Sequence, residues 1–478
     1  MKKTVFLLLP ALFAFAASAQ TLVSSTLLGT RTKVQLTAQF SLPLIQFGAK
    51  FYRLTYTTPD VKGQTDTVSG LLVIPDAPQK IWPRVVYQHG TSSSKQDVPS
   101  FNAFTGEGVI GGLFAGLGYV AFAPDYVGLG VSGGIHPYVH AQTEAYAAID
   151  MLRAAQAFLA QEKVAVSEQL FLTGYSQGGH AAMALHRELE TNLSQEFTVT
   201  ASAPLSGPYS ISGVMREVML SNEIYYYPAY LPNTMLSYQS AYGNIYSELT
   251  DVLKPVYAAE VDKFIKGTLN LSQLNNNLIA LLTNNEGACR PVKMFQPALV
   301  EAVNNHPDHP VNVALRANDV HKWAPKAPTR LLYCTADDQV PYRNSLVARD
   351  TLLAKGAVDL QAFDVNTTAD HGQCVTPALT NTVLFFAGLQ QIGTVPAYEM
   401  FENQTLTVFP NPAGEVAFLS QLPTKGRVEL FDVAGRLHYT GTAGPGDARL
   451  DLGALPAGVY GLRFWGEGKV WWGRVLKE

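Results

Sequence analysis

The chain has 478 residues, of which 47% are apolar and 15% are charged, and its formal net charge is −4. This length exceeds the usual size of one domain and supplies ample material for a core, so we expect two folded domains. The small net charge excludes a strongly basic surface of the kind that binds nucleic acid, and it favours a neutral or apolar partner.

The first residues, "MKKTVFLLLPALFAFAASAQ", combine two lysines, an apolar run and the small-x-small pattern Ala17-Ser18-Ala19. This pattern predicts a secretory signal peptide over residues 1–19, cut after Ala19. No later stretch approaches the roughly 18 to 20 uninterrupted apolar residues that a membrane-spanning helix needs. We therefore expect an exported protein without an integral membrane segment.

Short apolar runs, rich in β-branched and aromatic residues, follow along the chain. They are "TVSGLLVIP", "RVVYQHG", "YVAFAPD", "QLFLTG", "TASAPLSG", "RLLYCTAD" and "LQAFDV". Several are nearly continuous in apolar residues, as strands buried on both faces should be. Between the third and fourth runs, "AQTEAYAAIDMLRAAQAFLAQE" repeats its apolar residues at helical spacing. This alternation predicts an α/β fold over residues 20–395, with helices on both faces of a mostly parallel sheet.

The stretch "LFLTGYSQGGHAAMALHREL" places Ser176 between a predicted strand and a predicted helix. "GYSQG" fits the G-x-S-x-G nucleophile elbow, in which a strained turn projects the serine hydroxyl above the carboxyl edge of the sheet. We expect Gly174 and Gly178 to leave room for close backbone, and Gly179 to ease packing between helix and strand. Ser176 is therefore the candidate nucleophile.

A serine nucleophile needs a histidine base, and the base needs an acid that fixes its tautomer. In α/β-hydrolases the order along the chain is serine, acid, histidine. "TADDQVPY" and "NTTADHGQC" follow two predicted strands in that order, so His371 is the candidate base and an aspartate of the first segment is the candidate acid. His180 lies on the helix that follows Ser176, where we expect it to be packed or hydrogen-bonded rather than catalytic.

The tetrahedral intermediate of such a reaction needs two amide donors. In this fold one is the amide of the residue after the nucleophile, here Gln177, and the other comes from the loop after an early strand. "VVYQHGT" ends such a strand, which makes Thr91, or else Gly90, the second candidate.

Three cysteines, Cys289, Cys334 and Cys374, permit one disulfide within the chain. Cys334 closes a predicted strand and Cys374 lies three residues past His371, so these two could be neighbours, although spacing alone leaves the pairing open. "HPDHP", from His306 to Pro310, is the close histidine pair, and its prolines indicate a polar loop rather than a metal site. We expect no metal and no organic cofactor.

The segments "HGT", "APDYVGLG", "EAYAAIDMLRAAQ", "GYSQGG", "APLSGPY", "TADDQVP" and "DHG" together resemble the secretory lipase family of α/β-hydrolases, over about residues 60–395. The resemblance implies a serine esterase or lipase with the triad Ser176, Asp337 and His371. In the family the acid lies three residues before the valine of Gly-x-x-Asp-x-x-Val-Pro, so Val340 selects Asp337 over Asp338, although a cysteine replaces the glycine here. "TADD" and "DHG" are also similar to prolyl-oligopeptidase-type peptidases. Those proteins carry a large propeller domain before the hydrolase, and this sequence is too short to include one there.

An insertion at about residues 209–325 separates "APLSGPY" from the acid-bearing strand and is far longer than a simple crossover requires. It contains helical stretches and the tyrosine-rich segment "NEIYYYPAYLPNTMLSYQSAYGNIY". We expect a helical cap over the active site, as in lipases of the resembled family. Its tyrosines suit either a partly wet substrate tunnel or the cap's own core.

After a linker at residues 396–404, residues 405–478 change to short alternating strands with Gly/Pro turns, which predicts a small β-sandwich. "FPNPA", "VELFDVAGR" and "GVYGLRF…GRVLKE" resemble the type IX secretion sorting domain of Gram-negative bacteria. The resemblance implies export through the periplasm and outer membrane to the medium or cell surface. A carbohydrate-binding module would instead use Trp465, Trp471 and Trp472, but adjacent strand residues face opposite ways, so Trp471 and Trp472 cannot share one platform.

These observations predict a secreted serine hydrolase that cleaves carboxylic esters through an acyl-enzyme. Two alternatives stay open at this point. One is a prolyl-oligopeptidase-like serine peptidase, and the other is a non-catalytic surface binding protein built on the hydrolase fold.

Overall fold

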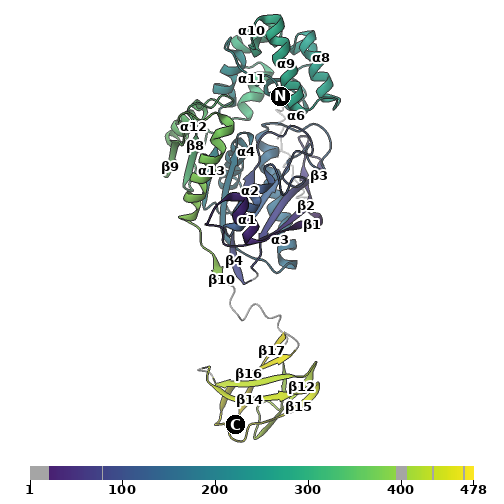
Figure 1. Cartoon of the computed structure of the whole chain (residues 1–478), viewed down its shortest axis with the longest axis vertical. Coiled ribbons are helices and arrows are strands. Elements are labelled where there is room, and N and C mark those ends of the chain that lie inside the picture. Colours follow the sequence, from purple (N-terminus) through teal and green to yellow (C-terminus); the bar gives the residue numbers. More distant parts are fainter. Residues whose placement is uncertain (1–20, 78, 395–405, 433–434, 467–468) are drawn as a thin grey trace, which may run out of the picture. The chain divides into compact units, whose positions relative to one another are not determined.

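The computed structural model describes residues 21–77, 79–394, 406–432, 435–466 and 469–478 (Figure 1). The predicted signal peptide, and the predicted linker at 396–404, lie outside the described residues. The chain divides into two compact units, one that ends at Gly393 and one that runs from Thr394 to Glu478. Each unit is described by itself.

The first unit is built on a ten-stranded sheet with the order β1-β2-β3-β5-β4-β6-β7-β8-β9, and β10 pairs with β4. The strands are β1 (Leu22–Arg31), β2 (Ala49–Pro59), β3 (Thr65–Pro75), β4 (Lys80–Gln88), β5 (Val120–Pro124), β6 (Ala165–Tyr175), β7 (Ala201–Leu205), β8 (Thr329–Tyr333), β9 (Leu360–Asp364) and β10 (Gly393–Thr394). From β5 through β4 to β9 the neighbours are parallel, whereas β1, β2, β3 and β5 pair antiparallel. All seven predicted strands are present, whereas β1, β2 and the two-residue β10 were not predicted.

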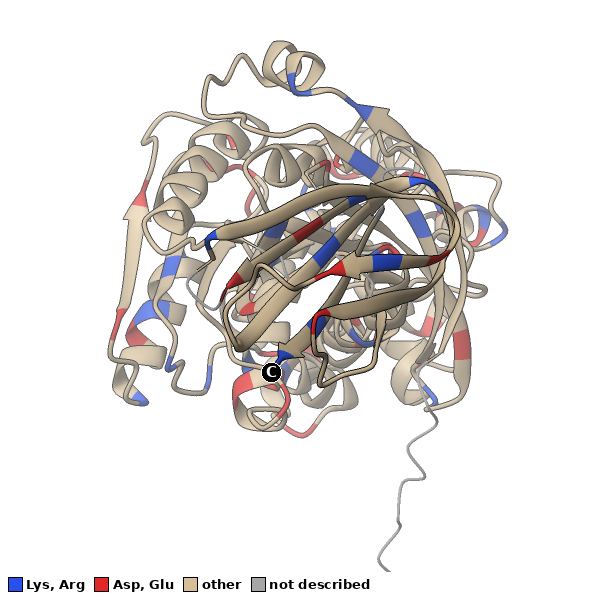
Figure 2. Cartoon of the chain, turned by 90° about the horizontal axis from the view of Figure 1, so that it is seen from below, with Lys and Arg blue, Asp and Glu red and all other residues tan. Residues whose placement is uncertain are grey.

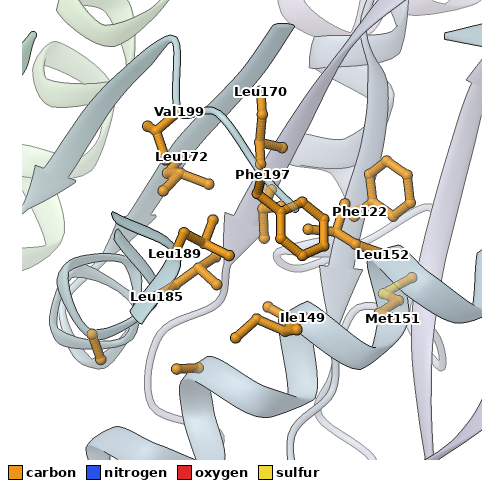
Figure 3. Packing of buried hydrophobic residues seen from close by; sticks show 14 of the residues in the cluster. Phe122, Ile149, Met151, Leu152, Leu170, Leu172, Leu185, Leu189, Phe197 and Val199 are labelled. Atoms are coloured by element: carbon orange, nitrogen blue, oxygen red, sulfur yellow. The ribbon is translucent and has the colours of Figure 1, made fainter. Parts of the chain in front are cut away.

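Helices cover both faces of this sheet, as expected. They are α1 (Lys33–Phe40), α2 (Gly108–Gly116), α3 (Ala141–Gln161), α4 (Gln177–Thr191), α12 (Arg343–Ala354) and α13 (His371–Ala387). The core on one face combines α3, α4 and α12 with the sheet, and the core on the other combines α1, α2 and α13 with it. Figure 3 shows the first core, in which Ile149 and Leu152 of α3 and Leu185 of α4 belong to one cluster with Leu170 and Leu172 of β6. The two cores fix the carboxyl edge of β6, from which Ser176 follows.

The predicted cap is helical and lies between β7 and β8. Its elements are a π-helical turn (Ile211–Met215), α5 (Arg216–Leu220), α6 (Tyr230–Tyr242), α7 (Leu249–Val252), α8 (Pro255–Ile265), α9 (Leu271–Glu286), a 3₁₀ turn (Pro291–Met294), α10 (Pro297–Asn305) and α11 (Pro310–Ala317). Local sequence sets their ends: α8, α10 and α11 each have proline in the first turn, and Asn270 forms a capping box with Gln273 at the start of α9. Figure 1 shows α8 to α11 gathered at one end of this unit, and the cap has its own apolar core.

The second unit is a β-sandwich, as predicted. One sheet contains β11 (Thr407–Phe409), β12 (Val416–Leu422) and β15 (Gly446–Asp451), and the other contains β14 (Leu437–Ala443), β13 (Gly426–Asp432), β16 (Gly458–Gly466) and β17 (Lys469–Lys477). Leu419 and Leu450 of the first sheet share one core with Leu430 and Leu462 of the second. Figure 2 shows basic and acidic residues interspersed along these strands, in keeping with the chain's small net charge.

The tryptophans of the sandwich divide between its two sides. Trp471 is buried in the core, whereas Trp465 and Trp472 are exposed. The guanidinium carbon of Arg463 lies 5.0 Å from the Trp465 ring centroid and 5.5 Å from that of Trp472. The predicted opposite orientation of Trp471 and Trp472 is therefore correct, and the two exposed rings flank an arginine.

Among the described residues, no helix combines the length and the apolar character that crossing a bilayer requires.

Candidate active site

Ser176 lies at the junction of β6 and α4 in a backbone conformation that is rare for a residue with a side chain. Its φ is 60° and its ψ is −120°. A Cβ at Gly178 would collide with the backbone carbonyl of Gln88, one at Gly174 with the carbonyls of Gly178 and Gln88, and one at Gly179 with the carbonyl of Leu205. The three glycines therefore let neighbouring backbone pass close to the turn that carries Ser176, for the reasons expected from the sequence.

The structure brings Asp337 and His371 together. Asp337 follows β8, and its Oδ2 lies 2.7 Å from Nδ1 of His371, the first residue of α13. The other carboxylate oxygen accepts the backbone amides of Gln339 (3.0 Å) and Val340 (2.8 Å). An anionic Asp337 is thereby oriented so that Nδ1 of the imidazole carries the proton, which leaves Nε2 free to act as a base.

Tyr175, the residue before Ser176, connects the elbow to His371. Its hydroxyl donates to the His371 carbonyl at 2.5 Å, and the two ring centroids lie 4.9 Å apart. A disulfide between Cys334 and Cys374, with Cα atoms 6.0 Å apart, joins the loop that carries Asp337 to helix α13. Cys289 is a free, buried thiol.

Asp338 also contacts His371, but through the backbone. Its Oδ1 accepts the His371 amide at 3.2 Å, and its Oδ2 accepts the Tyr227 hydroxyl at 3.1 Å. Asp338 therefore holds the start of α13 and contacts the cap, while Asp337 faces the imidazole.

The three candidate oxyanion donors have different surroundings. Gln177 is the first residue of α4, so its amide has no acceptor within the helix. The Gly90 amide donates to both carboxylate oxygens of Glu107, at 3.0 and 2.9 Å, and is therefore already engaged. The Thr91 amide donates to no other group in the described part of the chain, which favours Thr91 over Gly90 as the second donor.

Glu107 was not identified from the sequence. It is the N-cap residue of α2, and its Oε2 also accepts the Tyr87 hydroxyl at 2.6 Å. It thus fixes the loop after β4 that presents Thr91. Its sequence signal is a lone acidic residue in the glycine-rich segment "FTGEGVIGG".

A buried polar network supports the Gln177 side chain. The Gln177 Nε2 donates to Oε1 of Glu144 at 2.8 Å and lies 2.7 Å from Nε2 of His136. Burial lowers the pKa of His136 to about 4, so its imidazole is neutral and its Nε2 can accept this bond. The other Glu144 oxygen lies 2.7 Å from Nδ1 of His180, whose Nε2 lies 2.9 Å from the Asn318 carbonyl. Both ring nitrogens of His180 are occupied, as expected for a packed, non-catalytic histidine.

Glu144 was not identified from the sequence either. It belongs to α3 and is fully buried. The available signal was an acidic residue among the alanines of a buried helix. Such a residue requires a partner, because burying an isolated carboxylate costs free energy.

The cap tyrosines fall into two groups, of which the first has the core role considered for them. Tyr238 and Tyr257 are buried in the cap core. Tyr225, Tyr227 and Tyr230 instead donate their hydroxyls to the loop after Asp337: Tyr225 to the Gln339 carbonyl (2.9 Å), Tyr227 to Asp338, and Tyr230 to Gln339 Oε1 (2.8 Å). These three hydrogen bonds join the cap to the loop that carries the candidate acid.

Side chains with metal-binding chemistry do not cluster in the described ranges: no group of three or more His, Cys, Asp or Glu residues could hold an ion there. In the "HPDHP" segment, His309 accepts the Val311 amide at the start of α11, so it caps a helix.

No known family model matches this chain, and no curated protein matches it. Solved structures do. The rice cell wall degrading esterase LipA from Xanthomonas oryzae is 29% identical, over 77% of this chain and 98% of its own, with a TM-score of 0.66; a mutant form of it gives 0.69 at the same identity and coverage. Candida antarctica lipase A in its closed state is 15% identical over 78% of this chain and 83% of its own, with a TM-score of 0.57, and shares the fold.

These similarities agree with the mostly parallel sheet and the helices around it. The chain has the α/β-hydrolase fold, and its similarity to these esterases assigns it to the carboxylic ester hydrolases.

Proposed function

We propose that this chain is a secreted serine esterase that hydrolyses carboxylic esters through an acyl-enzyme, with Ser176 as nucleophile, His371 as base and Asp337 as the orienting acid. The observation that carries the proposal is the combination of a strained Ser176 at the edge of β6 with the 2.7 Å contact between Asp337 and His371 at the same edge.

In the first half-reaction, Nε2 of His371 takes the Ser176 proton as Oγ attacks the ester carbonyl carbon. The negative charge that develops on the carbonyl oxygen is stabilised by the amides of Gln177 and Thr91. Asp337 stabilises the imidazolium, which then gives its proton to the departing alcohol. This step leaves the acyl group bound to Ser176.

In the second half-reaction, His371 takes a proton from water, and the resulting hydroxide oxygen attacks the acyl carbon. The same two amides hold the oxyanion, and the imidazolium returns its proton to Ser176 Oγ as the carboxylic acid leaves. The residues return to their starting protonation states.

Replacement of the nucleophile tests this assignment. Ser176→Ala should abolish labelling by a fluorophosphonate and lower the hydrolysis of p-nitrophenyl butyrate by about 10⁶-fold, because loss of a triad serine has this effect in a well-studied protease. The melting temperature should stay close to that of the parent. Activity within tenfold of the parent would contradict the assignment.

The same assay separates the two alternatives. Hydrolysis of a prolyl peptide amide in preference to the ester would favour a peptidase. A folded parent that neither reacts with the fluorophosphonate nor hydrolyses the ester would favour a binding protein.

We further propose that the chain leaves the cell through the type IX secretion machinery of a Gram-negative bacterium. Two sequence features support this: the signal-peptide pattern of residues 1–19 and the resemblance of the C-terminal sandwich sequence to a sorting domain. The substrate would then be an ester outside the cell or at its surface.

A further inference from the structure

A small cavity of about 50 Å³ adjoins Ser176 and Gln177. Most of its wall comes from the cap, through the apolar residues Ile211, Met215, Met219, Leu231, Met235 and Leu315. A cavity needs roughly 10 to 15 Å³ to admit one water, which takes up about 30 Å³ in the liquid, so this cavity has room for about two to four water-sized groups.

Three polar side chains that the cap contributes to this wall already have partners. The Arg216 guanidinium donates to Asn312 Oδ1 (2.9 Å) and to the Val303 carbonyl (2.6 Å). The Tyr230 hydroxyl donates to Gln339, and the Thr234 hydroxyl to the Tyr230 carbonyl (2.9 Å). A charged or strongly polar substituent would therefore compete with these existing bonds and lose its hydration, whereas a hydrocarbon chain would not.

Helix α6 separates this space from a larger one. Tyr230, Leu231, Thr234 and Met235 line the small cavity, whereas Asn233 and Leu236 line a cavity of about 590 Å³ that touches none of the three triad residues. An acyl group on Ser176 must stay in place while the alcohol escapes to solvent. The small apolar cavity therefore suits the acyl group.

We infer that the enzyme selects esters of short, unsubstituted monocarboxylic acids, with acyl groups from acetyl to about butyryl. This inference rests on the proposed esterase function. It assigns acyl selection to the cap, through Met219 and Met235, rather than to the hydrolase core.

The first measurement uses the parent protein alone and compares kcat/KM for p-nitrophenyl acetate, butyrate, octanoate and laurate. Each methylene buried in the cavity should raise kcat/KM about fourfold, so the value rises from acetate to butyrate. It should then fall by about tenfold or more at octanoate, because a longer chain overfills the cavity. Octanoate or laurate hydrolysed at least as fast as butyrate would overturn the inference and indicate that the chain passes α6 into the larger space.

Variants locate the selection in the cap. Met235→Ala enlarges the cavity and should move the best substrate to a longer chain, while Thr234→Leu fills it and should lower the butyrate rate more than the acetate rate. Met294→Ala is the matched control, since Met294 is buried in the cap core but does not line this cavity. A shift in Met294→Ala equal to that in Met235→Ala would overturn the assignment to this wall.

Fluorophosphonate labelling separates the two levels of failure. Labelling at Ser176 with a preference for long acyl chains would overturn the acyl assignment alone. A parent that is neither labelled nor active on any ester would overturn the proposed function, and the acyl assignment with it.

Discussion

Asp337 and Asp338 are neighbours in the chain but make different contacts with the same histidine. Asp337 accepts from the imidazole, and Asp338 accepts from the backbone amide of His371 and from Tyr227. One carboxylate therefore acts on the protonation of the ring, and the other acts on the position of the helix that carries it.

Substitution of each aspartate by asparagine separates these roles. Asp337→Asn should keep the fold but lower kcat by up to about 10⁴-fold, because the amide favours the wrong imidazole tautomer. Asp338→Asn should change kcat little, since its amide oxygen can still accept the His371 amide. Steady-state kinetics on p-nitrophenyl butyrate measure both, and the reverse ranking would move the acid to Asp338.

At this scale the sequence predicted positions better than contacts. Motif order along the chain pointed to Ser176, His371 and an acid in "TADD", because each motif follows a strand and parallel strands end at one edge. The contact of Asp338 with Tyr227, and those of Glu107 with Gly90, join segments that only tertiary packing brings together, so spacing could not reveal them.

At the scale of elements, the predicted strands were those buried on both faces, whose apolar runs are nearly continuous. β1 is mostly exposed and lies at the end of the strand order, beside β2, so its sequence "LVSSTLLGTR" carries no such run. The cap was predicted as a helical insertion, but the ends of its individual helices depend on prolines and capping residues within that long insertion. The start of α13 at His371 was also missed, although Asp370 and Gln373 form a capping box there.

Helix α3 begins at an unusual cap. His140 is its N-cap residue, with Nδ1 at 3.4 Å from the Thr143 amide and 3.0 Å from the Thr143 hydroxyl. Burial, and secondarily the nearby His180, lowers the pKa of His140 to about 4. The cap therefore requires a neutral imidazole.

This cap should make the protein sensitive to acid. Between pH 6.5 and about 4 the unfolded chain binds the proton and the folded chain does not, so the contribution is complete above pH 6.5 and falls by about 1.4 kcal/mol per pH unit below it. His140→Asn keeps a good N-cap without the titration. Melting temperatures at pH 7 and pH 4.5 should converge more closely in this variant than in the parent; an equal loss in both would exclude His140 as a source of the acid sensitivity.

At the scale of the whole molecule, the proposed catalytic residues, the cap and both cavities all belong to the first unit. The second unit has its own core and its own sheets. The chain thus combines one unit that carries the proposed catalytic residues with one whose sequence resembles a type IX secretion sorting domain.

A chain that ends at Gln404 tests this division. It should retain kcat and KM on p-nitrophenyl butyrate in vitro, because each proposed catalytic residue precedes the cut, yet it should not reach the medium or cell surface of a host that carries the type IX machinery. Enzyme assays on the purified protein and on cell fractions measure the two effects.

A carrier protein fused behind the signal peptide and ahead of residues 405–478 is the complementary control and should be exported. A folded but inactive truncation would show that the sandwich contributes to the site.

The disulfide between Cys334 and Cys374 closes a loop with a sequence separation of 40, whose two ends carry Asp337 and His371. Closing such a loop removes conformational freedom from the unfolded chain, worth about 4 kcal/mol in the chain-entropy account. That advantage exists only where thiols are oxidised, so the same chain retained in a reducing cytoplasm would fold from a more disordered starting ensemble. The compartment in which the chain folds therefore determines how much stability this crosslink adds to the segment that holds Asp337 and His371.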